Sequence, residues 1–126
     1  MTTALAPVCA TLVTGPSAQA REAAIAASLP AAHGATAIIL EGLAPGSSPL
    51  DAFAASLHPA PARIAPGCLC CTGNLVLRVT LNRLLRQRPE RLFIGVARGE
   101  HLDQLRSWLQ SEPYDQLLRL TPDLQA

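Results

Sequence analysis

Three short apolar runs limit the folds open to this chain more than any other feature of its sequence. Residues 8–13 (VCATLV), 35–40 (ATAIIL) and 91–97 (RLFIGVA) are apolar almost throughout. Strands that are apolar along their whole length are typical of parallel sheets whose two faces are both covered. We therefore expect these runs to be buried strands of one parallel sheet.

Helical patterns separate the apolar runs. The clearest spans residues 74–87, where leucines recur on one face and arginines occupy much of the rest. Further elements are expected at residues 20–29 and 101–110 (helices), 50–57 (a short helical piece), and 62–65 and 116–120 (strands). Alternating strands and helices predict one α/β domain over residues 1–126, with an open, mostly parallel sheet and helices on both faces.

Charge and composition exclude several classes of partner. Ten basic residues stand against nine acidic ones, for a net charge of +1, and the few aromatic residues are scattered. A nucleic-acid groove needs a basic surface with stacking aromatics, so we expect no nucleic-acid partner. No apolar run reaches the length of about eighteen residues that a membrane span needs. Residues 1–7 also lack the charged start of a signal peptide, so we expect a cytoplasmic protein with no membrane partner.

Three cysteines within four residues form the sharpest chemical motif. Cys68, Cys70 and Cys71 follow a Pro-Gly turn and come shortly before the helix expected from residue 74. The dipole and free amides of a helix N-terminus favour thiolates, and thiolates bind soft metal ions such as Zn(II) or Cu(I). Three thiolates leave a tetrahedral Zn(II) one ligand short, so a fourth must come from elsewhere or from water.

The alternative is that the clustered cysteines are small buried hydrophobes, since free cysteine is among the most buried residue types. We expect Cys9 to be of that kind. It lies near the start of the first strand, about 16 Å from the loop at the far end of that strand. Cys9 is therefore predicted to lie in the core, out of reach of the other three.

The loop after the first strand has the register of a phosphate-binding loop without its chemistry. The P-loop template reads Gly, four residues, then Gly-Lys-Ser/Thr, between a strand and a helix. Here Gly15 holds the first position, while Ala20, Arg21 and Glu22 hold the last three. Arg21 has the positive charge of the template's lysine, but carries it on a bulky planar group. Glu22 replaces the hydroxyl that ligates Mg²⁺. Gly15 and Arg21 are thus the candidate nucleotide-binding residues of a degenerate loop, and no catalytic residue is predicted.

Taken together, these segments resemble the CobW family of P-loop GTPases and metallochaperones. Residues 12–15 (LVTG) look like the family's strand and P-loop, and residues 38–42 (IILEG) are similar to its strand ending in Asn-Glu-x-Gly. Residues 66–75 (PGCLCCTGNL) resemble its Gly-Cys-x-Cys-Cys signature, and residues 92–120 resemble its Walker-type strand and the helix that follows. The resemblance implies a P-loop NTPase-like fold and GTP hydrolysis coupled to metal delivery.

Departures from the family pattern argue against catalysis. Gly95 stands where the family places an acidic residue. The guanine-reading Asn/Thr-Lys-x-Asp segment is missing, because the chain contains no lysine. The matched stretches correspond to only the first part of a CobW-like protein, so we expect a truncated domain. We therefore expect no GTPase activity and no GTP or Mg²⁺ cofactor.

The resemblance carries over a metal site. It implies Cys68, Cys70 and Cys71 as ligands, with Glu41, at the Glu of the Asn-Glu-x-Gly motif, as a further candidate. The alternative for Glu41 is a solvated loop carboxylate. His101, at the start of an expected helix, could complete such a site or be structural.

Three functions remain open at this stage. The leading interpretation is a CobW-like domain that has lost GTP hydrolysis and binds Zn(II) through its Cys-x-Cys-Cys turn. The first alternative is a pseudo-GTPase that works as an interaction protein, through association with a second copy or with another protein. The second alternative is a divergent GTP-binding metallochaperone.

Overall fold

The computed structural model of the chain describes residues 7–29, 35–42, 46–53, 57, 60–64, 75–97, 99 and 102–126. Its elements, in chain order, are β1 (Val8–Thr14), α1 (Ala18–Ser28), β2 (Thr36–Glu41), the 3-10 helix η2 (Pro49–Phe53), β3 (Ala62–Ile64), α2 (Leu75–Leu85), β4 (Arg91–Gly95), α3 (Leu102–Leu109), α4 (Tyr114–Leu117), β5 (Leu118–Leu120) and β6 (Leu124–Gln125). The described strands form one sheet in the order β3-β2-β4-β1-β5, and β6 also pairs with β1. Every pairing is parallel, which confirms the parallel α/β fold expected from the apolar runs.

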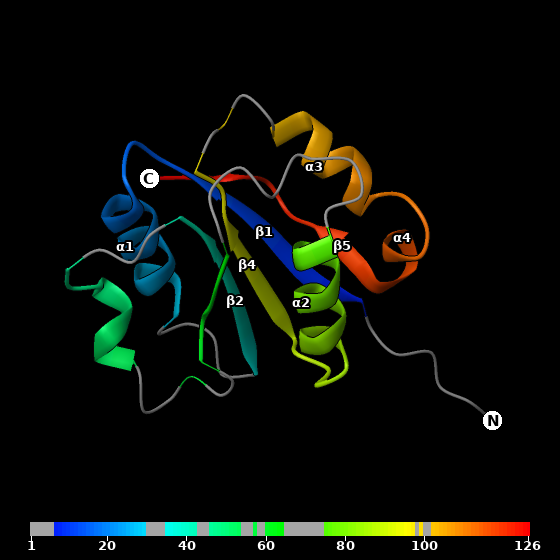
Figure 1. Ribbon diagram of the computed structural model, residues 1–126, viewed down its shortest axis with the longest axis horizontal. Coiled ribbons are helices and arrows are strands. Elements are labelled where there is room, and N and C mark those ends of the chain that lie inside the picture. The colour runs from blue at the N-terminus through cyan, green and yellow to red at the C-terminus, as the bar shows by residue number, and fades with distance from the viewer. Residues whose placement is uncertain are drawn as a thin grey trace.

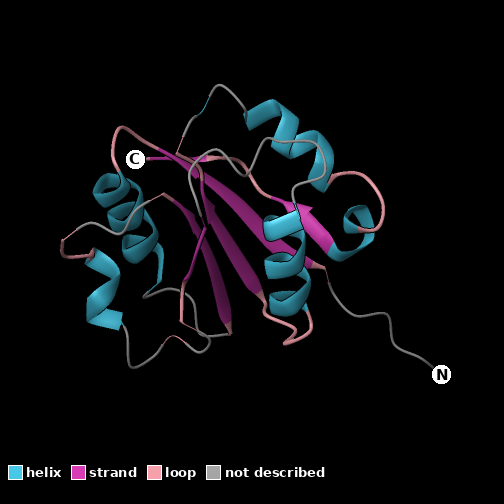
Figure 2. Cartoon of the chain, viewed as in Figure 1, coloured by secondary structure: helices cyan, strands magenta, loops and turns pink. Residues whose placement is uncertain are grey.

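Helices cover both faces of the sheet (Figure 1 and Figure 2). α1 and η2 lie on one face, and α2, α3 and α4 lie on the other. The central strand β4 serves both sides, because successive side chains of a strand point to opposite faces. Leu92 and Ile94 join the core under α2 and α3, while Phe93 joins the core under α1.

The core under α2 and α3 is built from leucines at helical spacing. Leu77 and Leu81 on α2 and Leu105 and Leu109 on α3 are at most 1% exposed. The apolar face predicted for the helix after the cysteines is therefore confirmed, although it begins at Leu75 and its last leucine, Leu85, is only partly buried. None of the described helices is long and apolar enough to pass through a membrane.

Two expected elements are present in a modified form. The helical piece expected at residues 50–57 starts as the 3-10 helix Pro49–Phe53, a form that commonly connects longer elements, and residues 54–56 lie outside the described part of the chain. The strand expected at residues 116–120 begins only at Leu118, because Gln116 and Leu117 belong to α4. α4 and β6 had no counterpart in the sequence patterns, since four-residue and two-residue elements carry no measurable periodicity.

Cys9 is exposed, so the prediction that it lies in the core is wrong. It sits in β1 between the buried residues Val8 and Ala10, and so points to the opposite face of the strand. Its register neighbours are Arg91 on β4 and Arg119 on β5, and Arg119 is exposed as well. This corner of the α1 face, at the amino end of β1, is open to solvent.

Candidate functional site

The carboxyl ends of the parallel strands lie together at one edge of the sheet. From β1 the chain continues to α1 on one face, and from the neighbouring strand β4 it continues to α3 on the other face. In open α/β sheets, ligands bind outside the carboxyl ends of the strands at such a change of direction. The same edge carries the loop after β1, the end of β2 and the start of the connection from β3 to α2, so it is the candidate site.

The loop after β1 is short, because α1 begins early. The helix begins at Ala18, so only residues 15–17 separate it from the strand. Ser17 caps the helix: its hydroxyl accepts a hydrogen bond from the amide of Ala20 at 3.0 Å, and its carbonyl accepts one from the amide of Arg21 at 3.0 Å. A phosphate-binding loop presents free amides to its anion. Here the amides at the positions of the P-loop Gly and Lys already have acceptors.

The guanidinium of Arg21 lies back across this loop. Its Nη1 donates to the carbonyl oxygen of Gly15 at 2.9 Å, and the residue is 7% exposed. Gly15 is itself tightly packed, because a Cβ at this position would lie 2.6 Å from Cβ of Ala126 and 3.2 Å from Cγ of Arg21. The amide of Ala126 donates to the carbonyl of Thr14 at 2.7 Å. The two residues predicted to bind nucleotide thus contact each other.

Glu22, at the position of the P-loop hydroxyl, is buried in an ion pair between α1 and β3. It is 1% exposed, and its carboxylate accepts hydrogen bonds from Nη1 and Nη2 of Arg63 at 3.0 and 2.9 Å and another from the hydroxyl of Ser48. Burial raises the pKa of Glu22, but the hydrogen bonds from Arg63 and Ser48 and the charges of Arg63 and Arg21 outweigh it and hold the pKa below its usual value. The hydrogen bond with Glu22 in turn raises the pKa of Arg63. In place of a magnesium ligand, this position carries a structural charge.

Arg63 was missed by the sequence reasoning, although one feature marks it. It stands between Ala62 and Ile64 in a short strand of a sheet that was expected to be buried. A charged side chain in such a place needs an opposite charge nearby, because an unpaired buried charge is strongly unfavourable. The sequence alone did not show that Glu22, 41 residues away, would supply it.

Glu41 forms the end of β2 and is 6% exposed, so its interpretation as a solvated loop carboxylate is wrong. Its Oε1 accepts a hydrogen bond from the amide of Ala97 at 2.7 Å, which ties the end of β2 to the chain leaving β4. Alternation along β2 places the Glu41 side chain on the same face as Ile39, which belongs to the core under α2. Glu41 is also the register partner of Ile64, the last residue of β3.

Four of the predicted metal-site residues lie outside the described parts of the chain: Cys68, Cys70, Cys71 and His101. They fall in or beside connections whose ends are described. β3 ends at Ile64 beside Glu41, and α2 begins at Leu75. Within the described ranges alone, no group of three or more His, Cys, Asp and Glu side chains is placed to hold a metal ion.

Gly95, where the CobW pattern has an acidic residue, is fixed by packing. A Cβ at this position would lie 3.2 Å from Cδ2 of Leu40 and 3.8 Å from the carbonyl oxygen of Ile39. The added side chain would meet the core under α1, to which Leu40 and Phe93 belong. A carboxylate there would therefore be buried among apolar atoms.

Comparison of the chain with protein-family models, with curated proteins and with solved structures gives no match in any of the three. The resemblance to the CobW family therefore stays a prediction, and the functional argument rests on the site.

Proposed function

We propose that this chain is a cytoplasmic, CobW-like domain that binds Zn(II) through Cys68, Cys70 and Cys71 and does not hydrolyse GTP. The observation that carries the proposal is where the connection containing these cysteines starts. It leaves β3 at the carboxyl edge of the sheet, directly beside the buried carboxylate of Glu41. Three thiolates and a carboxylate form a donor set that suits Zn(II), and cytoplasmic cysteines are kept reduced.

The short connection keeps these donors near one another. Cys68 is four residues beyond Ile64, a reach of at most about 14 Å even for an extended chain. Cys71 is four residues before Leu75, where the eleven-residue helix α2 begins and where its dipole favours thiolates. Since paired strands lie about 4.8 Å apart, Glu41 is within the same range.

Glu41 has the character of a carboxylate that supports a metal centre. Ligating carboxylates are usually hydrogen-bonded themselves, because such bonds fix their orientation. The amide of Ala97 provides such a bond to Glu41, and burial of the residue keeps it in place. In this proposal Glu41 either completes the ligand set or orients the fourth ligand.

The loss of GTP hydrolysis is supported by the loop after β1. The amides of Ala20 and Arg21, which follow this loop, are bonded to Ser17, and the guanidinium of Arg21 is directed at the carbonyl of Gly15. Gly95 has no space for an acidic side chain without displacing Leu40. These features argue against both a cradle for phosphates and an acidic ligand for Mg²⁺.

Native mass spectrometry of reduced protein, purified without chelator, tests the metal site. We expect about one zinc ion per chain, and none in the variant carrying Cys68→Ser, Cys70→Ser and Cys71→Ser. Cys9→Ser is the matched control and should retain the zinc, because Cys9 lies at the opposite, amino end of β1. A stoichiometry near zero in the unaltered protein, or zinc retained by the triple variant, would contradict the proposal.

Calorimetric titration with GTP and Mg²⁺ tests the nucleotide half of the proposal. We expect no binding heat, because the amides of Ala20 and Arg21, at the positions of the P-loop Gly and Lys, are already bonded to Ser17. Measurable affinity that disappears in an Arg21→Ala variant would instead support the divergent GTP-binding metallochaperone.

A second candidate function, that of an interaction protein, is favoured by the outer face of α2. Leu75, Val76 and Val79 are 66%, 50% and 55% exposed, although Leu77 and Leu81 on the other side of the same helix are completely buried. Single exposed apolar residues are common, but a cluster on one helix is typical of an interaction surface. In this alternative the surface binds a second copy of the chain or another protein.

Light scattering after gel filtration, with and without a chelator, separates the two candidates. An oligomer that persists without metal and dissociates in the variant Val76→Asp/Val79→Asp would favour the interaction protein. Ala23→Asp/Ala27→Asp, at two exposed positions of α1 on the other side of the sheet, is the control for a general effect of added negative charge. A monomer under all conditions would count against this second candidate.

A further inference from the structure

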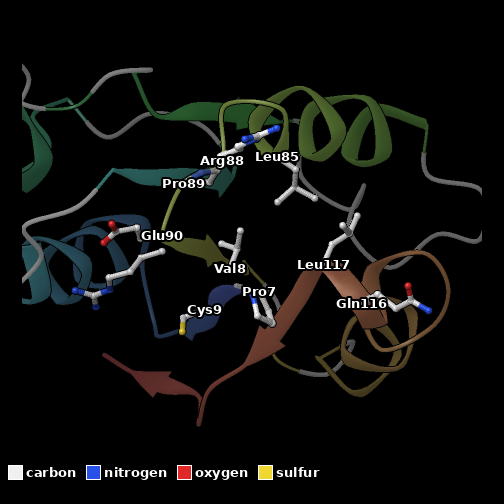
Figure 3. A pocket seen from close by; sticks show the side chains of 10 residues that line it. Pro7, Val8, Cys9, Leu85, Arg88, Pro89, Glu90, Gln116 and Leu117 are labelled. Carbon is white, nitrogen blue, oxygen red and sulfur yellow. The ribbon is translucent and has the colours of Figure 1, made fainter. Parts of the chain in front are cut away.

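A cavity lies at the amino end of the sheet, at the opposite edge from the candidate metal site. Its volume is about 520 Å³, within the range of small-molecule pockets. Its walls come from the start of β1, the turn after α2, the start of β4 and the end of α4. Figure 3 shows the apolar side chains of Val8, Leu85 and Leu117 around its interior.

Apolar groups in this cavity remain partly exposed. Leu117 is 44% exposed, although its chain neighbour Leu118 is only 6% exposed. Leu85 is also only partly buried, and Pro7 and Pro89 extend the apolar lining. An apolar molecule in the cavity would therefore remove apolar surface from water, which is the main favourable term in binding such ligands.

One cation at the rim is available to a ligand. Arg91 is already engaged, since its Nη1 donates to the carbonyl of Ser28 at 3.4 Å and its guanidinium lies 4.8 Å from the ring centroid of Phe93. Arg88, by contrast, has no ion pair or side-chain hydrogen bond with any residue that the structure describes. The lining contains two arginines, Arg88 and Arg91, and one acidic residue, Glu90, so its net charge is +1.

The backbone of Arg88 is a second, independent indication. Its φ is +53°, in the left-handed region that side chains other than glycine adopt at a cost in free energy. The residue follows α2, where its amide donates to the carbonyl of Leu85 at 3.0 Å, and glycine is the usual residue at such helix ends. Non-glycine residues held in such backbone regions cluster at active sites and ligand clamps, so an arginine here marks a candidate binding side chain.

We propose that this cavity binds a small apolar carboxylate. The apolar chain packs against Val8, Leu85 and Leu117, and Arg88 pairs with the carboxylate at the rim. A carboxylate fits better than a larger or more highly charged anion, because Arg88 is the single cation available among the described lining residues and the rest of the interior is largely apolar. This site is independent of the metal and of the function proposed above.

Titration calorimetry of the chain of residues 1–126 with decanoate, below the micellar concentration of decanoate, tests the proposal. We expect saturable binding of one decanoate per chain, and at least about tenfold weaker binding of decanol, which lacks the charge. Arg88→Gln should weaken decanoate binding by a similar factor. Arg83→Gln, an exposed arginine of α2 outside the cavity, should leave the affinity unchanged.

Arg88→Gly separates a role in binding from a role in folding. Glycine relieves the left-handed backbone, so this variant should melt at a higher temperature and yet bind decanoate at least about tenfold more weakly. A variant that merely failed to fold would lose both. Unchanged decanoate affinity in Arg88→Gly and Arg88→Gln would overturn the assignment of Arg88.

Leu117→Asp reports where the ligand binds, because Leu117 lines the cavity and is 44% exposed. This variant should bind decanoate at least about tenfold more weakly, since its carboxylate would face both the apolar chain and the ligand's own charge. Absence of saturable decanoate binding would overturn the proposal, as would binding that Leu117→Asp leaves unchanged. Equal affinity for decanol would identify a neutral amphiphile as the occupant and would likewise overturn the carboxylate.

Discussion

Replacement of Arg63 by methionine should destabilise the protein by leaving the carboxylate of Glu22 buried without a partner. Glu22 is 1% exposed and accepts two hydrogen bonds from Arg63. Removing one partner of a fully buried pair costs about 3–5 kcal/mol. Because the Arg63 side chain is 30% exposed, water replaces part of the lost interaction, and we expect a loss of about 2–3 kcal/mol at pH 7.

The pH dependence follows from the pKa of Glu22. In the unaltered protein this pKa is lowered from 4.5, so the stabilisation from the pair is present above about pH 4.5 and is lost as the pH falls through the lower folded value. In the Arg63→Met variant, only the hydrogen bond from Ser48 and the charge of Arg21 still oppose burial, the largest single influence on the pKa of Glu22, so we expect this pKa to be raised. The folded variant then takes up a proton before the unfolded chain does, so the difference in stability should shrink as the pH falls from 7 toward 4.5.

Urea unfolding followed by the fluorescence of Trp108 measures the effect. Trp108 is the only tryptophan, and it packs against the core beside Tyr114, with ring centroids 4.8 Å apart. Arg83→Met, at an exposed position, should change the free energy of unfolding by no more than about 0.5 kcal/mol. The double variant Glu22→Gln/Arg63→Met should be more stable than Arg63→Met alone, because no buried charge remains. A loss below about 1 kcal/mol for Arg63→Met, independent of pH, would refute the reasoning.

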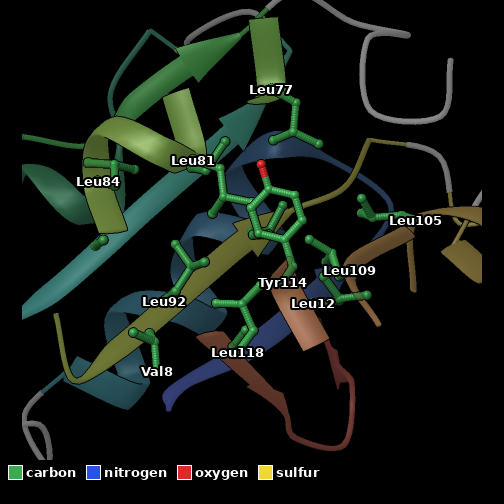
Figure 4. Close-up of a cluster of buried hydrophobic side chains, with 14 of the residues drawn as sticks. Val8, Leu12, Leu77, Leu81, Leu84, Leu92, Leu105, Leu109, Tyr114 and Leu118 are labelled. Atoms are coloured by element: carbon green, nitrogen blue, oxygen red, sulfur yellow. The ribbon is translucent and has the colours of Figure 1, made fainter. Parts of the chain in front are cut away.

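Three further predictions concern hydrogen bonds of the fold. The hydroxyl of Tyr114 donates to Oδ1 of Asn82 at 2.8 Å, and the ring lies in the middle of the leucine core (Figure 4); Tyr114→Phe should cost about 1 kcal/mol in urea unfolding. Burial is the main factor that raises the pKa of Tyr114, so absorbance titration of this single tyrosine should give a midpoint above 10.0. The free energy of unfolding should then fall as the pH rises above the pKa of the phenol in the unfolded chain. A midpoint at or below 10.0 would contradict this prediction. Ser17→Ala should cost about 1 kcal/mol through loss of the helix cap, whereas Ser17→Gly should cost only a few tenths, and equal losses would argue against capping. Glu41→Ala should cost about 1–3 kcal/mol by leaving the amide of Ala97 without an acceptor, whereas Glu41→Gln, which keeps an acceptor, should cost clearly less in the same assay.

Local pattern was enough to predict the layers of the fold. Each apolar run of the sequence is a buried strand, and the leucines at helical spacing are the buried face of α2. Burial on both faces removes polar residues from a strand, and this leaves a pattern that can be read without knowledge of its neighbours. The predicted loop after β1 is also present, although α1 begins two residues earlier than the pattern indicated.

The candidate site could be predicted only in part, because its parts come from distant segments. The sequence indicated Arg21 as a remnant of a nucleotide-binding residue, but its contact with Gly15 depends on where α1 begins. It also indicated Glu41, but as a loop residue, since nothing local showed that the amide of Ala97 would hold it. Hydrogen bonds between residues more than fifty positions apart depend on strand order, and strand order is not encoded in any single segment.

The sequence by itself therefore determined the α/β class and the absence of a P-loop Gly-Lys-Ser/Thr after the first strand, because both depend on residue type and short-range spacing. The tertiary structure decided which charged side chains form ion pairs and which side chains remain exposed to solvent. It buried Glu22 against Arg63, and it left Cys9 exposed at an uncovered corner of the sheet. It also placed Arg88 beside an apolar cavity formed by the ends of four elements. The physical reason is that burial and electrostatic environment are set by what packs against a residue, and the packing partners come from parts of the chain that only the fold brings together.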